Sequence, residues 1–390
     1  MSLKKTTNCI ILLAAAAAVG LLVRWQQVSG GADIHVYTPV FRTNMTPALG
    51  ADRCVDCHAD VCRDFEVVAH DKTLVPGSDP EMQQHFAGRS FQPAADRPRV
   101  EFFRDGDQLR MRSDEYPESI PIDWFFGSGH HAITPVSLLN NPQGQTELIE
   151  CSVSWYPPDQ LGLTPGAAEL SQSGIAVLGN HVDHSTTMNC FGCHSTQLAE
   201  NLTGEIHAGS IVRGVSCERC HPDSRQHLES VTSGGESLME RWSELTPLES
   251  VNRCGECHRR ADQLTDQELS SERTVLVRFA SVGLAMSRCF QNQPQQGESP
   301  LRLDCMTCHN PHQPAVQSEE FYQQKCLQCH GESGQPSRSC SFSGTSEKCL
   351  SCHMPPVDAT EKLPLTDHWI RIRRPGDPPV SEHKPGNLPR

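Results

Sequence analysis

The chain has 390 residues, enough for roughly two or three ordinary domains, but only 37% of its residues are hydrophobic and 6% are aromatic. Side chains alone therefore supply little material for a large core, and the 28 glycines and 28 prolines predict many loops and few long elements. The formal net charge of −14, with lysines and arginines scattered rather than grouped, argues against nucleic acid as a partner and predicts an acidic, soluble surface that attracts basic proteins.

The first segment, residues 1–30, has the pattern of an export signal. Two lysines precede an apolar run over residues 9–23 that is rich in alanine, leucine and isoleucine. The run is shorter than the ~20 residues that comfortably span a bilayer. Small residues at 28–30 suit cleavage, whereas Trp25 suits a membrane interface, so a cleaved signal and a retained inner-membrane anchor both stay open. Both predict that the rest of the chain is periplasmic or otherwise extracytoplasmic.

Residues 31–90 contain the first of a set of recurring cysteine motifs, and residues 91–170 are predicted to form a β-rich insert. Apolar and polar side chains alternate over residues 100–111 on either side of Asp105-Gly106, a strong hairpin signal. A second alternation over residues 149–155 predicts another half-buried strand.

Residues 171–360 are predicted to form short helices and loops. Apolar residues recur near a 3.6-residue period over 276–287 and predict one longer helix. Ser318 is a predicted N-cap, because two glutamates follow it where the positive end of a helix dipole would lie. Residues 361–390 are rich in proline and arginine, and they predict an extended strap followed by a disordered tail.

Seven Cys-x-x-Cys-His motifs account for most of the 19 cysteines. Two cysteines three positions apart lie on one face of a helical turn, so both sulfurs can bond the two vinyl groups of one porphyrin. The adjacent histidine is then held beneath the iron as its proximal ligand. The motifs consist of Cys54, Cys57 and His58; Cys190, Cys193 and His194; Cys217, Cys220 and His221; Cys254, Cys257 and His258; Cys305, Cys308 and His309; Cys326, Cys329 and His330; and Cys349, Cys352 and His353.

Zinc is the alternative occupant, since zinc ribbons also use Cys-x-x-Cys pairs. Zinc sites do not require a histidine directly after the second cysteine, yet every such pair in this chain has one. The motifs therefore predict seven covalently bound c-type haems, whose large apolar porphyrins supply the core that the side chains lack. The predicted fold class is a multihaem cytochrome c, mostly short helices and loops wrapped around a haem array, with a small β-rich insert between haem 1 and haem 2.

The motif spacing predicts an uneven array. The long gap before Cys190 suggests that haem 1 stands apart beneath the insert, while six haems crowd into residues 171–360. Five cysteines lie outside the motifs: Cys9, Cys62, Cys151, Cys289 and Cys340. The last four allow up to two disulfides in an oxidising compartment, of which Cys289 with Cys340 is the first to test, although Cys151 could equally be a buried small hydrophobe.

Several segments carry a family resemblance: residues 127–134 (Gly-Ser-Gly-His-His-Ala-Ile-Thr), 214–221 with His227 downstream, 287–290, 305–312, and 349–355 with Asp367-His368. Through them the chain, from about residue 50 to 375, resembles exported multihaem cytochromes c of the group that includes the tetrahaem electron acceptor of hydroxylamine oxidoreductase. It looks most similar to members that are joined to tetratricopeptide repeats. The chain departs from the pattern after His221, where Pro-Asp-Ser replaces the usual Gly-Pro-Gly, and it shows no such repeat.

Twelve histidines lie outside the motifs, enough to give every haem a second imidazole ligand. The resemblance implies that five of them are distal ligands: His70, His131, His227, His312 and His368. His184 and His207 complete the predicted set of seven, with His181 as the alternative to His184. For each of these residues, the competing interpretation is a surface histidine or one bonded to a haem propionate.

An iron closed by two imidazoles suits electron transfer, whereas an iron with an open position binds substrate. The supply of histidines therefore predicts an electron carrier or a subunit of a respiratory electron-transfer chain, with redox proteins as donor and acceptor and no catalytic residue. The alternative is a multihaem oxidoreductase that acts on a small nitrogen or sulfur compound at one open haem. The chain has neither the Cys-x-x-Cys-Lys motif usual in pentahaem nitrite reductases nor a tyrosine in the context of the hydroxylamine oxidoreductase cross-link.

Overall fold

The computed structural model of the chain describes residues 47–171, 173–270, 272–294, 302–330, 349–360 and 363–381. The predicted export segment and the end of the predicted C-terminal tail lie outside these residues. Within the described ranges, no helix is both long enough and apolar enough to cross a membrane.

A four-stranded antiparallel sheet contains the predicted hairpin. Its strands, in spatial order, are β2 (Ser90–Phe91), β3 (Val100–Asp105), β4 (Gln108–Ser113) and β5 (Tyr116–Pro121). Asp105 pairs with Gln108, and Gly106 between them has a φ of 61°, which glycine adopts without strain. Phe102 and Leu109 are buried as the alternation predicts, so the hairpin is confirmed.

A five-stranded antiparallel sheet lies next to it. Its strands, in spatial order, are β1 (Leu74–Pro76), β6 (Trp124–Phe126), β7 (Thr134–Asn140), β8 (Thr146–Cys151) and β11 (Gly179–Val182). The single strand predicted over residues 149–155 is instead two, β8 and β9 (Val153–Tyr156), and β9 pairs with β10 (Gln160–Leu163). The break occurs at Ser152, where the chain passes from one partner strand to the other: the Ser152 amide donates to the Leu178 carbonyl beside β11, and the Ser152 carbonyl accepts from the Thr164 amide beside β10.

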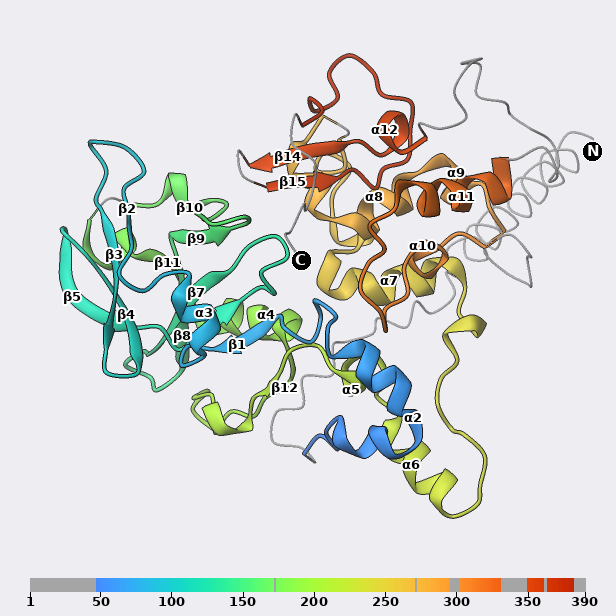
Figure 1. Cartoon of the computed structure of the whole chain (residues 1–390), viewed down its shortest axis with the longest axis horizontal. Coiled ribbons are helices and arrows are strands. Elements are labelled where there is room, and N and C mark those ends of the chain that lie inside the picture. The colour runs from blue at the N-terminus through green and yellow to red at the C-terminus, as the bar shows by residue number, and fades with distance from the viewer. Residues whose placement is uncertain are drawn as a thin grey trace, which may run out of the picture. The chain divides into compact units, whose positions relative to one another are not determined.

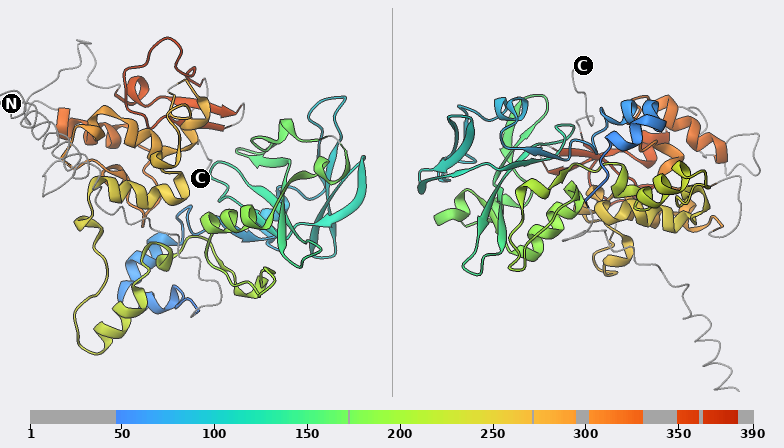
Figure 2. Two further views of the ribbon diagram at one scale, coloured as in Figure 1. Left: turned by 180° about the vertical axis from the view of Figure 1, so that it is seen from behind. Right: turned by 90° about the horizontal axis from the view of Figure 1, so that it is seen from below.

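The two sheets bury a common core. Phe102 and Met111 of the first sheet share one apolar cluster with Phe125 and Ile149 of the second, and Phe86 packs into it just after α3 (Pro80–Gln84). Strands β1 and β11 come from outside the 91–170 segment and β2 begins one residue before it, so the β region extends over residues 74–182. Figure 2 shows the strands of this region gathered together, in colours that run from blue through turquoise to green.

The opposite side of the larger sheet packs against helix α4 (His184–His194), which ends in the second cysteine motif. Trp124, Phe126 and Leu148 form one buried cluster with Phe191 of that helix. The sheet that continues from β1 to β11 leads directly into α4. That the insert covers haem 1 stays a prediction. The insert packs on the second motif.

The remaining helices contain or surround the other motifs (Figure 1). They are α2 (Asp52–Phe65), α5 (Cys217–Cys220), α6 (Ser224–Thr232), α7 (Pro247–His258), α8 (Ala280–Met286), α9 (Arg288–Gln291), α10 (Cys305–Cys308), α11 (Glu319–His330) and α12 (Cys349–His353). Helix α7 packs against α8 and α10, and α11 against α10 and α12. Two short strand pairs complete this part: β12 (Ser195–Gln197) with β13 (Val212–Arg213), and β14 (Pro356–Thr360) with β15 (Leu363–Thr366).

Local capping explains where several helices begin. Thr246 and Glu249 form a reciprocal capping box at the start of α7. The amide of Phe321 donates to the Ser318 hydroxyl at 3.2 Å, which confirms the predicted N-cap of α11. The helix predicted over residues 276–287 is shorter, because Phe279 has a non-helical backbone (φ −112°, ψ 77°) that separates α8 from a 3-10 turn at Thr274–Arg278.

Candidate haem-binding site

In all seven motifs, both cysteines lie within one helical turn, as the spacing predicts. The helices concerned are α2, α4, α5, α7, α10, α11 and α12. The histidine stands where the helix ends or breaks: His58, His221 and His309 have φ values of −120°, −120° and −124°. The ring can therefore turn away from the helix axis while the two sulfurs remain on one face.

Four motif histidines each face the ring of a histidine that lies far away in the sequence. The ring centroids are 6.3 Å apart for His58 and His227, 6.2 Å for His258 and His70, 6.1 Å for His221 and His312, and 6.3 Å for His309 and His368. Every pair combines one motif histidine with one of the predicted distal ligands.

These distances fit a metal ion held between the two rings. Metal–imidazole nitrogen bonds are about 2.0–2.1 Å long, so two of them in line, with the ring radii added, separate the centroids by roughly 6 Å. Aromatic rings that pack for their own sake spread over about 4.5–7 Å. The narrow range of the four distances, and the same composition of each pair, therefore favour axial ligation of an iron over ordinary ring packing.

Hydrogen bonds at Nδ1 orient three histidines, of which two belong to the remaining motifs and one to the four pairs. His194 Nδ1 bonds the Thr73 carbonyl at 2.9 Å, and His353 Nδ1 bonds the Arg371 carbonyl at 3.1 Å. His368 Nδ1 bonds the carbonyl of its own near neighbour Thr366 at 2.9 Å. A bond of this kind fixes the tautomer and leaves Nε2 to face the metal, as metal-binding histidines typically require.

Burial keeps these imidazoles in the neutral form that binds metals. Burial, followed by the nearby His70, lowers the pKa of His258 to about 4. Burial is also the largest cause of the lowered pKa of His70, His312 and His368. At neutral pH, their lone pairs are therefore available to an iron.

Cysteines of different motifs lie close together. Burial and the adjacent Cys217 thiol raise the pKa of Cys54 to about 12, which places motif 1 beside motif 3. The thiols of Cys193 and Cys257 are hydrogen-bonding neighbours, as are those of Cys254 and Cys305. Motif 4 therefore adjoins motifs 2 and 5.

The last motifs continue the series. Burial, followed by Cys349 and then Cys308, raises the pKa of Cys326 to about 11, so motif 6 lies between motifs 5 and 7. The first motif adjoins motif 3 through Cys54, although the sequence suggests that haem 1 stands apart.

The structure gives His184 and His181 other partners. His184 Nδ1 bonds the Thr146 carbonyl at 3.0 Å, and its Nε2 lies 3.0 Å from a Glu200 carboxylate oxygen. His181 Nε2 lies 2.7 Å from Glu147. In the described part of the chain, each ring therefore has an acidic neighbour rather than a motif histidine beside it, and ligation by His184, or by His181 in its place, stays a prediction.

For the other two distal candidates, ligation stays a prediction. His131 packs edge-on against His130 at 4.6 Å, and burial followed by His130 lowers its pKa to about 4. His207 is exposed at the start of a 3-10 turn. Within the described residues, neither ring faces a motif histidine as the four pairs do.

Sequence reasoning missed the groups that orient the motif histidines. Phe126 stacks on the His194 ring with centroids 4.3 Å apart, and the Thr73 and Arg371 carbonyls accept the Nδ1 bonds. A backbone carbonyl has no signature in the sequence, so only the fold reveals these acceptors. Cys62, Cys151 and Cys289 are free thiols, and the buried Cys151 fits the small-hydrophobe interpretation. The suggested partner Cys340 lies outside the described residues.

Residues 167–222 match the family model of cytochrome c554 and c-prime. This segment is similar to that family. It contains the second and third cysteine motifs, and the match supports a c-type cytochrome that binds haem and transfers electrons. Among solved structures, the crystal structure of the outer cell wall cytochrome OcwA is similar, with a TM-score of 0.48 and 14% identity over 85% of this chain and 81% of that chain. No curated protein matches the chain.

Proposed function

We propose that the chain binds seven c-type haems, one at each Cys-x-x-Cys-His motif, and carries electrons between redox proteins outside the cytoplasm. It acts either as a carrier or as a subunit of a respiratory electron-transfer chain. The observation that supports this most strongly is the set of four histidine pairs with centroids 6.1–6.3 Å apart, each joining a motif histidine to a distant one.

A bound haem would supply one-electron redox chemistry. The chain's own residues hold the histidines for this role. Burial keeps His70 and His258 neutral, and carbonyls such as that of Thr73 orient the motif rings. With a histidine on each side, a haem iron has no position for a substrate, which favours electron transfer over catalysis.

The contacts between motifs support a continuous electron path. Motif 1 adjoins motif 3, motif 4 adjoins motifs 2 and 5, and motif 6 adjoins motifs 5 and 7. Cys220 of motif 3 also lies near Cys254 of motif 4. Haems attached at these positions would be close neighbours, without a wall of polypeptide between them.

The charge of the chain indicates the kind of partner. A formal net charge of −14, to which haem propionates would add, favours basic redox proteins as partners. Residues 9–23 are proposed to be an export signal or an inner-membrane anchor, because c-type cytochromes with several haems are typically extracytoplasmic. Nucleic acid is not a proposed partner.

Intact-mass spectrometry of the mature holoprotein tests the number of haems. We expect the mass of the chain plus seven haems, and six after replacement of both Cys349 and Cys352 by alanine. Fewer than seven haems in the unaltered protein would contradict the proposal and would identify, by peptide mapping, which motif is empty.

Exposure of the reduced protein to carbon monoxide separates a carrier from an oxidoreductase. A haem closed by two histidines has no free position, so we expect an unchanged visible spectrum. A stoichiometric spectral change would instead favour a multihaem oxidoreductase acting on a small nitrogen or sulfur compound at one open haem.

A further inference from the structure

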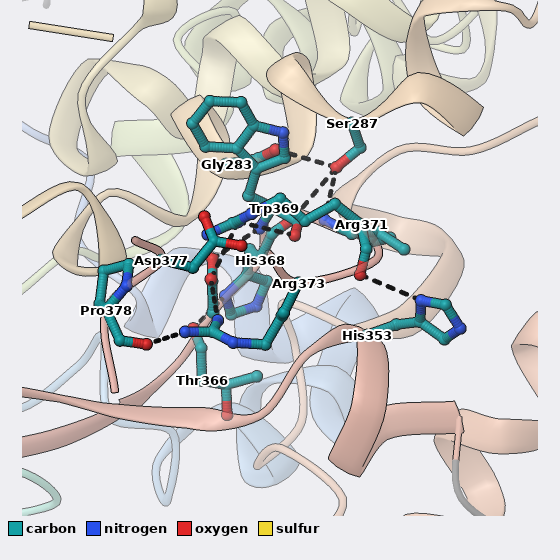
Figure 3. A network of polar contacts seen from close by, with 12 residues as sticks. Gly283, Ser287, His353, Thr366, His368, Trp369, Arg371, Arg373, Asp377 and Pro378 are labelled. Carbon is teal, nitrogen blue, oxygen red and sulfur yellow. Dashed lines mark hydrogen bonds and ion pairs between the residues drawn. The ribbon is translucent and has the colours of Figure 1, made fainter. Parts of the chain in front are cut away.

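One segment near the C-terminus contacts two different motif histidines. Residues 366–373 begin at the last residue of β15 and contact His309 of motif 5 and His353 of motif 7. His368 in this segment faces the ring of His309 at 6.3 Å, and the Arg371 carbonyl three residues later accepts the Nδ1 bond of His353 at 3.1 Å. Figure 3 shows His368 on the same stretch of backbone as the Arg371 carbonyl, and the bond from that carbonyl to His353.

Helix α8 holds this segment from one side. The buried Ser287 hydroxyl accepts a bond from the Ile370 amide at 2.8 Å and donates to the Gly283 carbonyl at 2.9 Å. Gly283 lets the segment approach, because a Cβ there would lie 2.7 Å from the Trp369 nitrogen and 2.9 Å from the His368 carbonyl carbon. The Ser287 hydrogen bond and the close approach at Gly283 therefore fix the backbone between His368 and Arg371.

A compact charge cluster holds the segment from the other side. Asp367 is 4% exposed, and its carboxylate pairs with Arg371 at 3.0 Å and Arg373 at 3.1 Å. The same carboxylate accepts from the Trp369 amide at 3.0 Å, and Asp377 pairs with Arg371 at 3.4 Å. Two aspartates and two arginines balance each other, so removal of one partner would leave a poorly hydrated charge and loosen the segment.

We propose that residues 366–373 position the axial ligands of two haems at once. The segment presents His368 as the distal ligand of the His309 haem and holds the His353 ring through the Arg371 carbonyl. Ser287 and Asp367 are positioning residues for both haems. This inference rests on the proposed function, because it requires haems at motifs 5 and 7.

The shared segment links the properties of the two haems. A hydrogen bond to Nδ1 makes a histidine a stronger donor to iron, which favours the oxidised state. A displaced Arg371 carbonyl would therefore raise the reduction potential of the His353 haem, while a displaced His368 would change the ligand field of the His309 haem. A change in one segment is expected to alter both.

The test uses holoprotein variants Ser287→Ala and Asp367→Asn, studied by electron paramagnetic resonance and potentiometric titration. The signal that changes in His368→Ala is assigned to the His309 haem. The signal that disappears when Cys349 and Cys352 are both replaced by alanine is assigned to the His353 haem. We expect both signals to shift together, with the other haems unchanged and with Ser287→Thr restoring the original spectrum. Ser137→Ala is the matched control, since it removes a buried serine hydroxyl within the β region and should move neither haem.

Three results would overturn the inference: a shift of only one of the two haems, no shift, or an equal shift of all haems. If Asp367→Asn does not fold, Arg373→Lys replaces it, because lysine keeps the charge but weakens the ion pair with Asp367. The same three results would then overturn the inference. Peptide mapping of the unaltered protein distinguishes failure of this inference from failure of the proposed function. A missing haem at motif 5 or 7 would contradict the proposed function itself.

Discussion

At the scale of single residues, the hydrogen bonds of a histidine ring determine which of its nitrogens can still bind a metal. His353 Nδ1 bonds the Arg371 carbonyl, and its Nε2 is proposed to face a haem iron, whereas His184 has Thr146 at Nδ1 and Glu200 at Nε2. The sequence singled out His70, His227, His312 and His368, all of which face motif rings. It could not predict which motif each would face, because those pairs join segments that only the fold brings together.

Replacement of His70 tests one such pair directly. We expect His70→Ala to convert one low-spin haem to high-spin, because His258 would lose the ring opposite it. Electron paramagnetic resonance of the oxidised protein measures the change. His181→Ala is the control, since that ring bonds Glu147 and its loss should leave every haem signal in place.

Glu150 of β8 gives a prediction about pH. Burial raises the pKa of Glu150, and Arg278 only partly opposes the effect. A carboxyl group whose pKa is raised in the folded state stabilises the fold at low pH and loses that contribution as the pH rises above its ordinary range. Glu150→Gln should therefore raise the melting temperature at pH 7, and the gain should shrink at pH 4. The exposed Glu169 is the control: a gain of the same size from Glu169→Gln would contradict this assignment.

At the scale of elements, local signals predicted local structure. Alternation and Asp105-Gly106 predicted the β3–β4 hairpin, and Ser318 predicted the start of α11. The three- and four-residue strands β1 and β11 were not predictable, since such short segments acquire their register from partners far away in the chain. For the same reason, the boundaries of the β region could not be predicted from composition.

Gly214 permits a close contact between two elements. Its φ is 66°, and a Cβ there would lie 2.0 Å from the Asp71 carbonyl oxygen, beside the bond from the Val215 amide to the His70 carbonyl. Gly214→Ala should therefore displace His70 and perturb the low-spin signal of the His258 haem. Gly209→Ala meets no atom within 4 Å and should leave that signal unchanged. Identical spectra for the two variants would contradict the role given to this contact.

The core of the β region should be separable from the haem sites. Leu109 is fully buried between the sheets, so Leu109→Ala should lower the free energy of unfolding by about 2–5 kcal/mol. Urea unfolding followed by circular dichroism measures the loss, and the haem spectrum of the folded protein should not change. Leu202→Ala, at a fully exposed side chain, should stay within about 0.5 kcal/mol of the unaltered protein.

At the scale of the whole chain, the side-chain core and the haem motifs occupy different parts of the sequence. The large apolar clusters lie in the β region and on α4, whereas among the described residues around the later motifs one small cluster forms about Val251, Leu284 and Phe290. This agrees with the low apolar content of the chain, because porphyrins would supply the missing core. The long gap between the first two motifs suggested an isolated haem, yet the fold brings Cys54 beside Cys217 of motif 3 and places His70 opposite His258 of motif 4.

Spin quantitation by electron paramagnetic resonance of the oxidised, full-length holoprotein tests the central claim most directly. The four histidine pairs predict at least four low-spin haems per chain, each with two imidazole ligands. Fewer than four, with high-spin signals making up the difference, would contradict the pairing of motif and distal histidines.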